Sequence, residues 1–173
     1  MKKVLLYGGL GILVIIILVA IFGGSSDKNG QQVTQPNQNQ EQQKSVYAVG
    51  ETVILKNHQL IANSVTTPWI SSNMFDKPQS SENEYVMVNV TIINNGKSQL
   101  SVNSFGFKLE DENGVQRNAS ITVANNQLST TELSVEGKVS GNLVFEAKTG
   151  SKTLKLHYSP GFLGGKEVVV NLK

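Results

Sequence analysis

The sequence contains no cysteine, and this absence excludes several kinds of site at once. Disulfides, thiolate-bound metals and catalysis by a cysteine nucleophile all need a thiol. Aromatic residues make up only 6% of the chain and include a single tryptophan, Trp69, so few positions offer a ligand a large aromatic surface. No stretch after residue 46 has the 3.6-residue periodicity of an amphipathic helix. The remaining candidates are all-β folds without disulfides.

The chain also lacks a basic surface of the kind that nucleic acids require. Residues 47–173 contain eleven Lys or Arg and eleven Asp or Glu, a net charge of zero. The formal excess of +2 comes from the N-terminal part, mainly from Lys2 and Lys3. A neutral domain does not provide the electrostatic attraction on which phosphate-backbone binding depends, so we expect no nucleic-acid partner.

The N-terminal segment 4–22 carries no charge and predicts an uncleaved transmembrane anchor. As a helix it would span roughly 28 Å, close to the hydrocarbon thickness of a bilayer. Residues 1–3 then form a cytoplasmic tail that keeps Lys2 and Lys3 inside, which sends the C-terminal domain to the extracytoplasmic side. Secretion after signal cleavage is the alternative, although the residues around 20–24 fit a cleavage site poorly.

Residues 23–46 read as a disordered linker rich in Gln and Asn. The segment has almost no hydrophobic residues, so it cannot bury enough surface to offset the entropy lost on ordering. A flexible coil of this length has a root-mean-square reach of roughly 25–30 Å. We therefore expect a tether between anchor and domain.

Residues 47–173 show the two-residue period of β-strands. The clearest case is 84–95, where alternate aliphatic positions predict one buried strand face: Val86, Val88, Val90 and Ile92. Further strands are predicted within 50–55, 59–65, 105–110, 121–123, 128–135, 138–147, 152–158 and 166–172. In 105–110, we expect Phe105, Phe107 and Leu109 to share a face. This spacing indicates an all-β fold, an immunoglobulin-like antiparallel β-sandwich of about seven to nine strands.

The order of several short motifs carries a family resemblance over about residues 47–172. These are Val49-Gly-Glu51, the run Tyr85–Gly96, Phe107–Gly114, Glu136–Phe145 and Leu154–Tyr158. The domain resembles the DUF4352 family of bacterial exported immunoglobulin-like domains, which belongs with immunoprotective extracellular antigens of mycobacterial type. The chain departs from the family by having Glu136-Gly137 where Pro-Gly is frequent, and by lacking the lipid-carrying cysteine of most members. The resemblance implies no established activity, so no catalytic residues are carried over.

The strongest candidate site is the predicted loop 66–83, which is long for a compact domain. It contains Trp69, Met74, Phe75 and Asp76, and Tyr85 follows it at the start of the next strand. In one interpretation Trp69 and Phe75 form an exposed anchor for a glycan, peptide or membrane surface. In the other, they fold back and cap the sandwich core.

Other chemistry finds little support in the residues. The turn 111–114 offers acidic oxygens but lacks a full calcium loop, and a hairpin turn explains it equally well. His58 and His157 are far apart and have no ligand-spaced partner, so both are expected on the surface and no metal or cofactor is expected. No nucleophile motif occurs outside the linker.

Three functions follow from these observations. The leading one is a non-enzymatic binding or scaffolding module at the bacterial cell envelope, whose partner is an envelope protein or glycan that meets loop 66–83 or pairs with a sheet edge. The second is a sensory or transport accessory domain that binds a small ligand or ion between the sheets, in a pocket lined by Trp69, Tyr85 and Phe105. The third is a hydrolase with an unrecognised site. We expect that the protein is not an enzyme.

Overall fold

The computed structural model describes residues 46–122, 124–160 and 167–173. These residues form eleven strands and one 3-10 helix, η1 (Ser104–Gly106). Several strands have only three residues, which is why the count exceeds the predicted seven to nine. The strands are β1 (Val46–Ala48), β2 (Thr52–Ile54), β3 (His58–Trp69), β4 (Asn83–Asn94), β5 (Leu100–Val102), β6 (Phe107–Glu110), β7 (Gln116–Asn118), β8 (Thr131–Leu133), β9 (Lys138–Lys148), β10 (Lys155–Tyr158) and β11 (Val168–Asn171).

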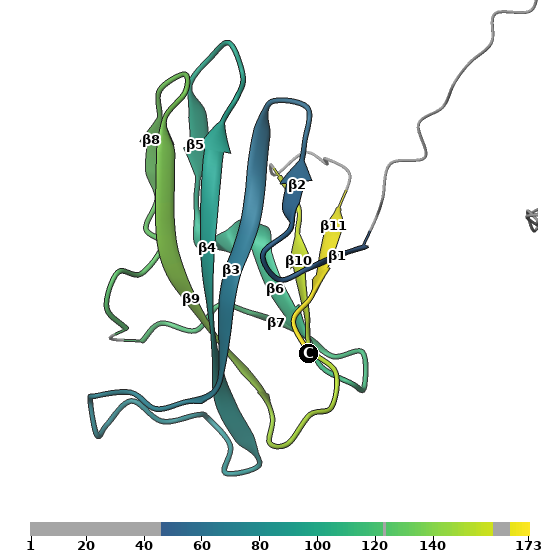
Figure 1. The fold of residues 1–173 in the computed structure, drawn as a ribbon. Helices are drawn as coiled ribbons and strands as arrows, with labels where there is room; N and C mark the ends of the chain where they lie inside the picture. Colours follow the sequence, from purple (N-terminus) through teal and green to yellow (C-terminus); the bar gives the residue numbers. More distant parts are fainter. Residues whose placement is uncertain (1–45, 123, 161–166) are drawn as a thin grey trace, which may run out of the picture. The chain divides into compact units, whose positions relative to one another are not determined.

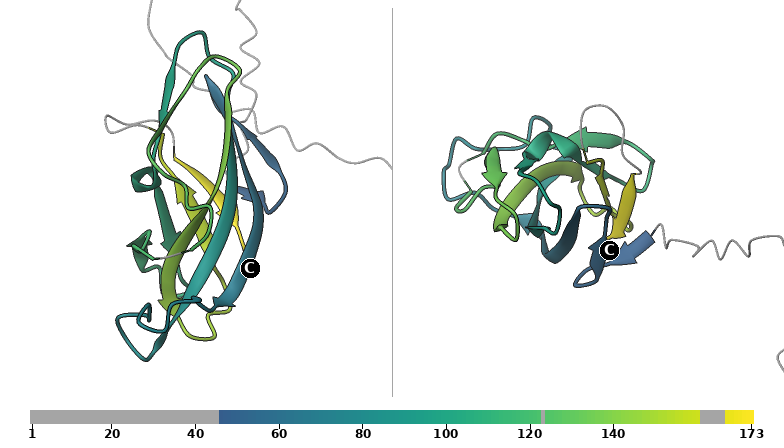
Figure 2. Two further views of the ribbon diagram at one scale, coloured as in Figure 1. Left: turned by 90° about the vertical axis from the view of Figure 1, so that its left-hand side faces the viewer. Right: turned by 90° about the horizontal axis from the view of Figure 1, so that it is seen from above.

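The strands form a β-sandwich, as the sequence predicted. One sheet has the order β2-β3-β4-β9 and the other the order β1-β11-β10-β6-β7. A small β5-β8 pair extends one end. Figures 1 and 2 show the two sheets as separate layers, with β3, β4 and β9 in the front layer. The long strands of the front sheet pair over many residues, so this sheet forms the rigid part of the domain.

The core lies between the sheets and contains the predicted face of β4. Val86, Val88, Val90 and Ile92 are fully buried. They belong to one hydrophobic cluster with residues of the opposite sheet, among them Phe107, Leu109, Leu156 and Val170. Each such side chain contributes roughly 1.5–3 kcal/mol when it leaves water. The space between the sheets is therefore filled by the protein's own side chains.

Three details differ from the sequence-based expectation. The sandwich is not wholly antiparallel, because β1 pairs with β11 in parallel. Phe105 does not share the buried face of Phe107: it lies in η1, where the side chain of Asn103 caps its N–H, and it is 84% exposed. No strand forms at 121–122, and Ile121 is fully exposed there.

The segment Ala119–Leu128 covers the free edge of β9. Backbone bonds join Ser120 N–H to the Val144 carbonyl at 2.7 Å and Leu128 N–H to the Asn142 carbonyl at 2.9 Å. Gly141 allows this close approach, because a Cβ there would lie only 2.7 Å from the Leu128 Cα. The covering segment protects β9 from pairing with another chain.

The predictions for the N-terminal region fall largely outside the described residues. This applies to the cytoplasmic tail 1–3, the anchor 4–22 and nearly all of the linker 23–46, whose last residue, Val46, begins β1. Within the described ranges, no helix reaches the length and apolarity that a membrane crossing requires.

Candidate binding surface

The loop between β3 and β4 is shorter than predicted, because β3 continues to Trp69. After a register shift that includes the cis Thr67–Pro68 bond, Trp69 pairs with Tyr85 of β4. The remaining loop is Ile70–Glu82. Trp69 and Tyr85 lie on the outer face of the front sheet, with ring centroids 5.9 Å apart and tilted by 53°. Aromatic pairs at this separation attract each other, which fixes both rings.

Hydrogen bonds to the sheet hold the loop Ile70–Glu82 in place. The Tyr85 hydroxyl donates to Asp76 Oδ1 at 3.1 Å, and the Gln79 N–H donates to Glu146 Oε1 at 3.0 Å. Asn83 Nδ2 donates to the other oxygen of Glu146 at 3.0 Å. Burial raises the pKa of Tyr85 to about 12, and the bond to Asp76 acts in the same direction. Tyr85 therefore remains a hydrogen-bond donor at neutral pH.

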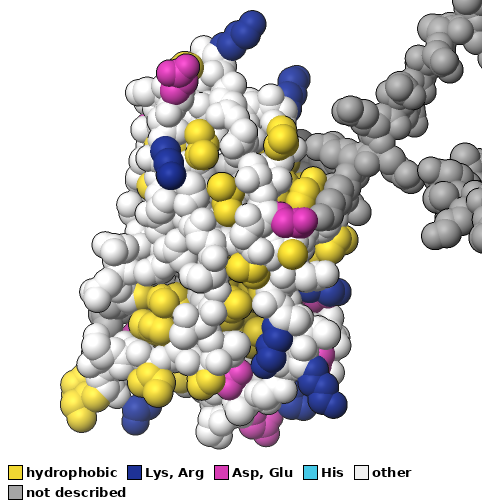
Figure 3. All heavy atoms as spheres, viewed as in Figure 1, with side chains coloured by type: hydrophobic (Ala, Val, Ile, Leu, Met, Phe, Trp, Pro, Cys, Tyr) yellow, Lys and Arg dark blue, Asp and Glu magenta, His cyan; other side chains and the backbone are white. Residues whose placement is uncertain are grey.

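The tip of the loop presents large hydrophobic side chains to solvent. Ile70, Met74 and Phe75 are 84%, 74% and 87% exposed. The turn beneath them is ordered by Asn73, whose side chain accepts the Phe75 N–H and whose carbonyl accepts the Asp76 N–H. The apolar side chains at the lower left of Figure 3 lie over this end of the domain. The predicted aromatics thus separate: Trp69 packs on Tyr85, and Phe75 projects outward.

Two shallow depressions of about 250 Å³ each flank Trp69. The first includes Asp76, Lys77, Glu84 and Tyr85 in its lining. The second lies toward the segment Ala119–Leu128. Its lining is Trp69, Ile70, Ser72, Met87, Ala124, Asn125 and Asn142. Phe105 lines neither depression, so the structure does not bring it together with Trp69 and Tyr85.

Asn125 and Asn142 belong to this surface but did not stand out in the sequence. The alternation Tyr85, Met87, Asn89 in β4 identifies the outer face of that strand. Asn142 reaches the same face only through the pairing of β4 with β9, in which it opposes Asn89. Strand pairing is a long-range property, and no local sequence pattern indicates that Asn142 lies beside Asn89.

The expectation that both histidines lie on the surface is wrong. His58 is 1% exposed, because it begins β3 and points into the core rather than occupying a turn. Its Nδ1 lies 2.8 Å from Asn57 Oδ1, and its Nε2 lies 3.0 Å from the Tyr158 hydroxyl. Since Asn57 Oδ1 can only accept, Nδ1 carries the proton and Nε2 accepts from Tyr158. Burial lowers the pKa of His58 and raises that of Tyr158 to about 12.

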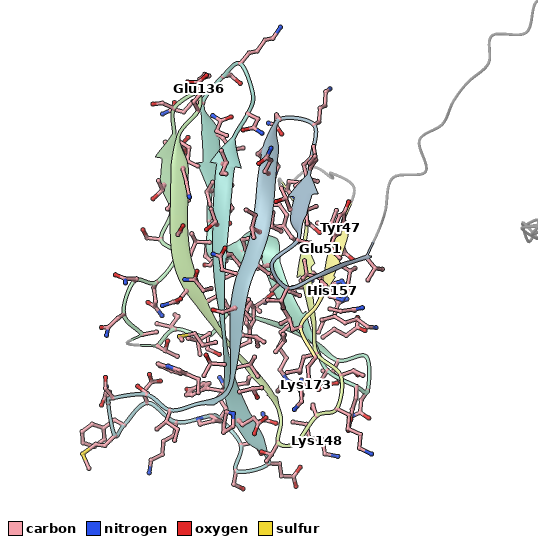
Figure 4. The ribbon with its side chains drawn as sticks, in the orientation of Figure 1. Tyr47, Glu51, Glu136, Lys148, His157 and Lys173 are labelled. Carbon is pink, nitrogen blue, oxygen red and sulfur yellow. The ribbon has the colours of Figure 1, made fainter. Side chains whose placement is uncertain are left out.

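His157 is 7% exposed and joins an ionic cluster on the other sheet. Its Nδ1 lies 2.8 Å from Glu167 Oε1, and its Nε2 lies 2.8 Å from Glu110 Oε2, the latter without hydrogen-bond geometry. Lys155 donates to Glu110 at 2.9 Å, and this bond, followed by one from Gln116, lowers the pKa of Glu110. Figure 4 places His157 on the side away from the β3–β4 loop.

A cavity of about 570 Å³ adjoins this cluster. It is lined by Asn103, Phe105, Gly106, Lys108, His157, Ser159 and Glu167. The Lys155 ammonium forms a salt bridge with Glu110, and the two ring nitrogens of His157 lie close to Glu110 and Glu167, so the cluster joins β6, β10 and the residue preceding β11. We therefore interpret the cluster as a structural link between these elements.

The turn after β6 uses its acidic residue internally. Asp111 Oδ1 accepts the backbone N–H groups of Asn113 and Val115, and Arg117 donates to Oδ2 at 2.6 Å. Burial alone would raise the pKa of Asp111, but these bonds hold it below its ordinary value. The turn is closed by its own hydrogen bonds, in keeping with the hairpin interpretation. Within the described residues, no group of three or more His, Cys, Asp or Glu is arranged to hold a metal ion.

Solved structures similar to this chain are bacterial β-sandwich proteins. The yjhA protein of Bacillus subtilis is 21% identical with a TM-score of 0.57, and the match covers 73% of this chain and 99% of that one. The candidate lipoprotein ycdA of Bacillus subtilis is 23% identical with a TM-score of 0.57 over 68% of this chain. The match spans only 36% of ycdA, about a third of its length. The TM-scores show a shared fold, and at these identities the likeness concerns the fold alone.

A more distant fold relative is the secreted protein MPT63 of Mycobacterium tuberculosis, with 9% identity and a TM-score of 0.53 over 74% of this chain and 95% of that one. No curated protein matches the chain significantly. A family model described as "Domain of unknown function (DUF4352)" matches residues 47–168. The resemblance to the DUF4352 family is thus confirmed, and the chain belongs to that family.

Proposed function

We propose that the protein is a membrane-anchored, extracytoplasmic β-sandwich that acts as a non-enzymatic binding module at the bacterial cell envelope, and that its β3–β4 loop engages a protein partner. The observation that carries the proposal is the loop tip. Ile70, Met74 and Phe75 are largely exposed on a loop whose backbone forms hydrogen bonds within itself and to Glu146. An apolar projection held by such bonds loses less entropy on binding than an unbonded loop would.

Two observations support the location. The charge-free segment 4–22 has the length of a bilayer-spanning helix and follows two lysines. Among the fold relatives, MPT63 is described as secreted and ycdA as a candidate lipoprotein, so this sandwich occurs in exported proteins. The tether 23–46 would then give the domain reach above the membrane.

The chemistry of the loop fits a protein partner better than a lipid surface or a sugar at the tip. The loop Ile70–Glu82 contains one basic residue, Lys77, and two acidic residues, Asp76 and Glu82. Its net charge is therefore negative, which disfavours binding to an anionic membrane. Ile70 and Met74 lack the flat ring on which a sugar packs. Aliphatic, methionine and phenylalanine side chains together match an apolar pocket on a protein.

Three carboxylates near the loop accept hydrogen bonds from the protein itself, which supports binding rather than catalysis. Asp76 accepts from Tyr85, Glu84 accepts from Thr67 at 2.9 Å, and Glu146 accepts from Gln79 and Asn83. A general acid or base needs a free path to a reacting proton. Asp76 and Glu146 instead bond the loop that carries the apolar tip to the sheet.

The loop is tested by affinity capture of the full-length protein from cells after chemical cross-linking, with Met74→Ala and Phe75→Ala variants. Burying one such side chain contributes roughly 1.5–3 kcal/mol, so each variant is expected to bind the partner about tenfold or more weakly. Ile121→Ala is the matched control, since Ile121 is a fully exposed hydrophobic residue outside the loop. Equal recovery with Phe75→Ala, Met74→Ala and wild type would refute the loop as the binding element.

Location is tested separately by adding a protease to intact cells and following the domain with an antibody. An extracytoplasmic domain is lost before the cells are lysed, while a cytoplasmic control protein survives. Protection of the domain until lysis would overturn the proposed topology.

A further inference from the structure

The second depression continues into a row of amide side chains on the outer face of the front sheet. The row consists of Asn63 from β3, Asn89 from β4 and Asn142 from β9, and is called the amide ladder below. Asn63 Nδ2 donates to Asn89 Oδ1 at 2.7 Å, and Asn89 Nδ2 donates to Asn142 Oδ1 at 2.6 Å. Asn142 Nδ2 donates to the Asn125 carbonyl at 2.7 Å. Asn125 and Asn142 also line the depression beside Trp69.

These bonds orient the amides and leave part of their hydrogen-bonding capacity for a ligand. An amide group has two N–H donors and a carbonyl with two acceptor sites. Asn63 also donates to Thr91 Oγ1 at 2.8 Å, so its nitrogen is fully used. Asn89 and Asn142 each donate once, which leaves one N–H on each. The surface therefore presents donors and acceptors whose directions are set before a ligand arrives, which lowers the cost of binding.

The face around the amide ladder carries no charge. Three adjacent rows of the sheet hold only neutral side chains at their outward positions. They are Ile61, Thr91 and Ser140, then the ladder itself, then Thr66, Met87 and Val144. Figure 3 shows this face with its charged side chains mainly toward the rim. A ligand that covers the ladder does not have to remove water from a charged side chain of the protein. A charged ligand would lose its own water there and gain no ion pair in return.

From these features we propose that the second depression and the amide ladder beside it, together called the glycan site below, bind a neutral glycan chain. A sugar ring has an apolar C–H face that packs on the indole of Trp69, and hydroxyls that both donate to and accept from amides. The depression of about 250 Å³ is smaller than the roughly 300–1,000 Å³ of a typical whole-ligand pocket. It therefore holds one unit of a chain whose next units lie over the whole ladder, from Asn142 through Asn89 to Asn63.

This site shares Ile70 with the proposed protein-binding tip, but it does not include the other two tip residues. Phe75 lines neither depression, and Met74 borders only the first. The glycan site is therefore expected to keep its affinity for the glycan in the Phe75→Ala variant. Loss of protein binding and loss of glycan binding can then be told apart in the same set of proteins.

Trp69 is the only tryptophan in the chain, so the tryptophan fluorescence of the protein reports directly on binding at the glycan site. The full-length protein, purified in a detergent without a sugar headgroup, is titrated with cellohexaose, maltohexaose and chitohexaose. A saturable change in emission is expected with at least one of them. Oligogalacturonate, which is charged, is expected to bind at least about tenfold more weakly than that neutral hexasaccharide.

The variants Asn142→Ala and Asn63→Ala are expected to weaken the titration by about tenfold, since each removes an amide of the ladder. Asn63 is exposed, so its variant should fold like wild type even where loss of the Asn142 bond to Asn125 lowers stability. Phe75→Ala is the control and should titrate like wild type. No saturable change with any neutral hexasaccharide, equal binding of oligogalacturonate, or unaltered binding by Asn63→Ala would each overturn the proposal.

Discussion

Replacing Tyr158 with phenylalanine removes one hydroxyl from the interior and leaves the rest of the side chain in place. Tyr158 is 6% exposed, and its ring stacks on Phe107 with centroids 4.5 Å apart. The hydroxyl meets Nε2 of His58, which is 1% exposed, at 3.0 Å. The bond joins β10 of one sheet to β3 of the other, so it contributes directly to the packing of the two layers.

The loss is expected to exceed that of an ordinary hydrogen bond. A typical bond contributes about 0.5–1.5 kcal/mol, but the variant also leaves Nε2 of His58 buried without a partner, which costs about 1–3 kcal/mol. The expected loss in the free energy of unfolding is therefore about 2 kcal/mol. For a domain of this size, that lowers Tm by roughly 6–10 °C.

Urea and thermal unfolding at pH 8, followed by circular dichroism, measure this change while His58 is neutral. The double variant His58→Leu/Tyr158→Phe provides the control, because removing both polar partners leaves none stranded. It should be less destabilised than the sum of the two single variants, by about 1 kcal/mol or more. A Tyr158→Phe protein within about 0.5 kcal/mol of wild type would refute the role assigned to the buried bond.

Three further results are expected, all from unfolding experiments. Burial lowers the pKa of His58, so as the pH falls below 6.5 the unfolded chain binds a proton on this residue before the folded protein does. The free energy of unfolding should therefore decrease below pH 6.5, by at most about 1.4 kcal/mol per pH unit. The His58→Leu variant should lack this component. A Gly141→Ala variant should lose about 1–3 kcal/mol, because the new methyl group meets the backbone of Leu128, and limited proteolysis should then cut the segment Ala119–Leu128. Asn94→Ala should lose about 3 kcal/mol in urea unfolding, because the fully buried Asn94 amide donates to three backbone carbonyls and accepts one backbone N–H.

The sandwich was predictable because the long strands carry a strict two-residue period. Val86, Val88, Val90 and Ile92 needed only alternation to be assigned to a buried face, and all four are fully buried. The parallel pairing of β1 with β11 was not predictable, since it joins residues more than 120 positions apart and each strand is short. Register across such a distance depends on the assembled core rather than on local pattern.

The candidate surface was predictable in part. The unusual composition of 66–83 pointed to Trp69 and Phe75, but β3 extends beyond the predicted strand 59–65, through Pro68 to Trp69. The histidines show a second limit. His157 alternates with the buried Leu156 and Tyr158, which suggested that its side chain points outward and is exposed. Its side chain is nevertheless buried beside Glu110 and Glu167, which lie on neighbouring parts of the sheet. Burial on an outer face depends on neighbouring side chains that sequence periodicity does not reveal.

The attachment of β1 to β11 has a mechanical consequence. The chain enters the domain at Val46, and β1 is held at the sheet edge by three register pairs to the last strand. A pull along the axis of β1 loads these pairs together in shear, whereas a sideways pull opens them one at a time. The other four strands of that sheet pair without β1. Release of β1 would therefore lengthen the segment that precedes the domain and leave the core intact. Under the proposed anchoring, β1 would be the first element to separate when the membrane and a partner pull on the domain in opposite directions.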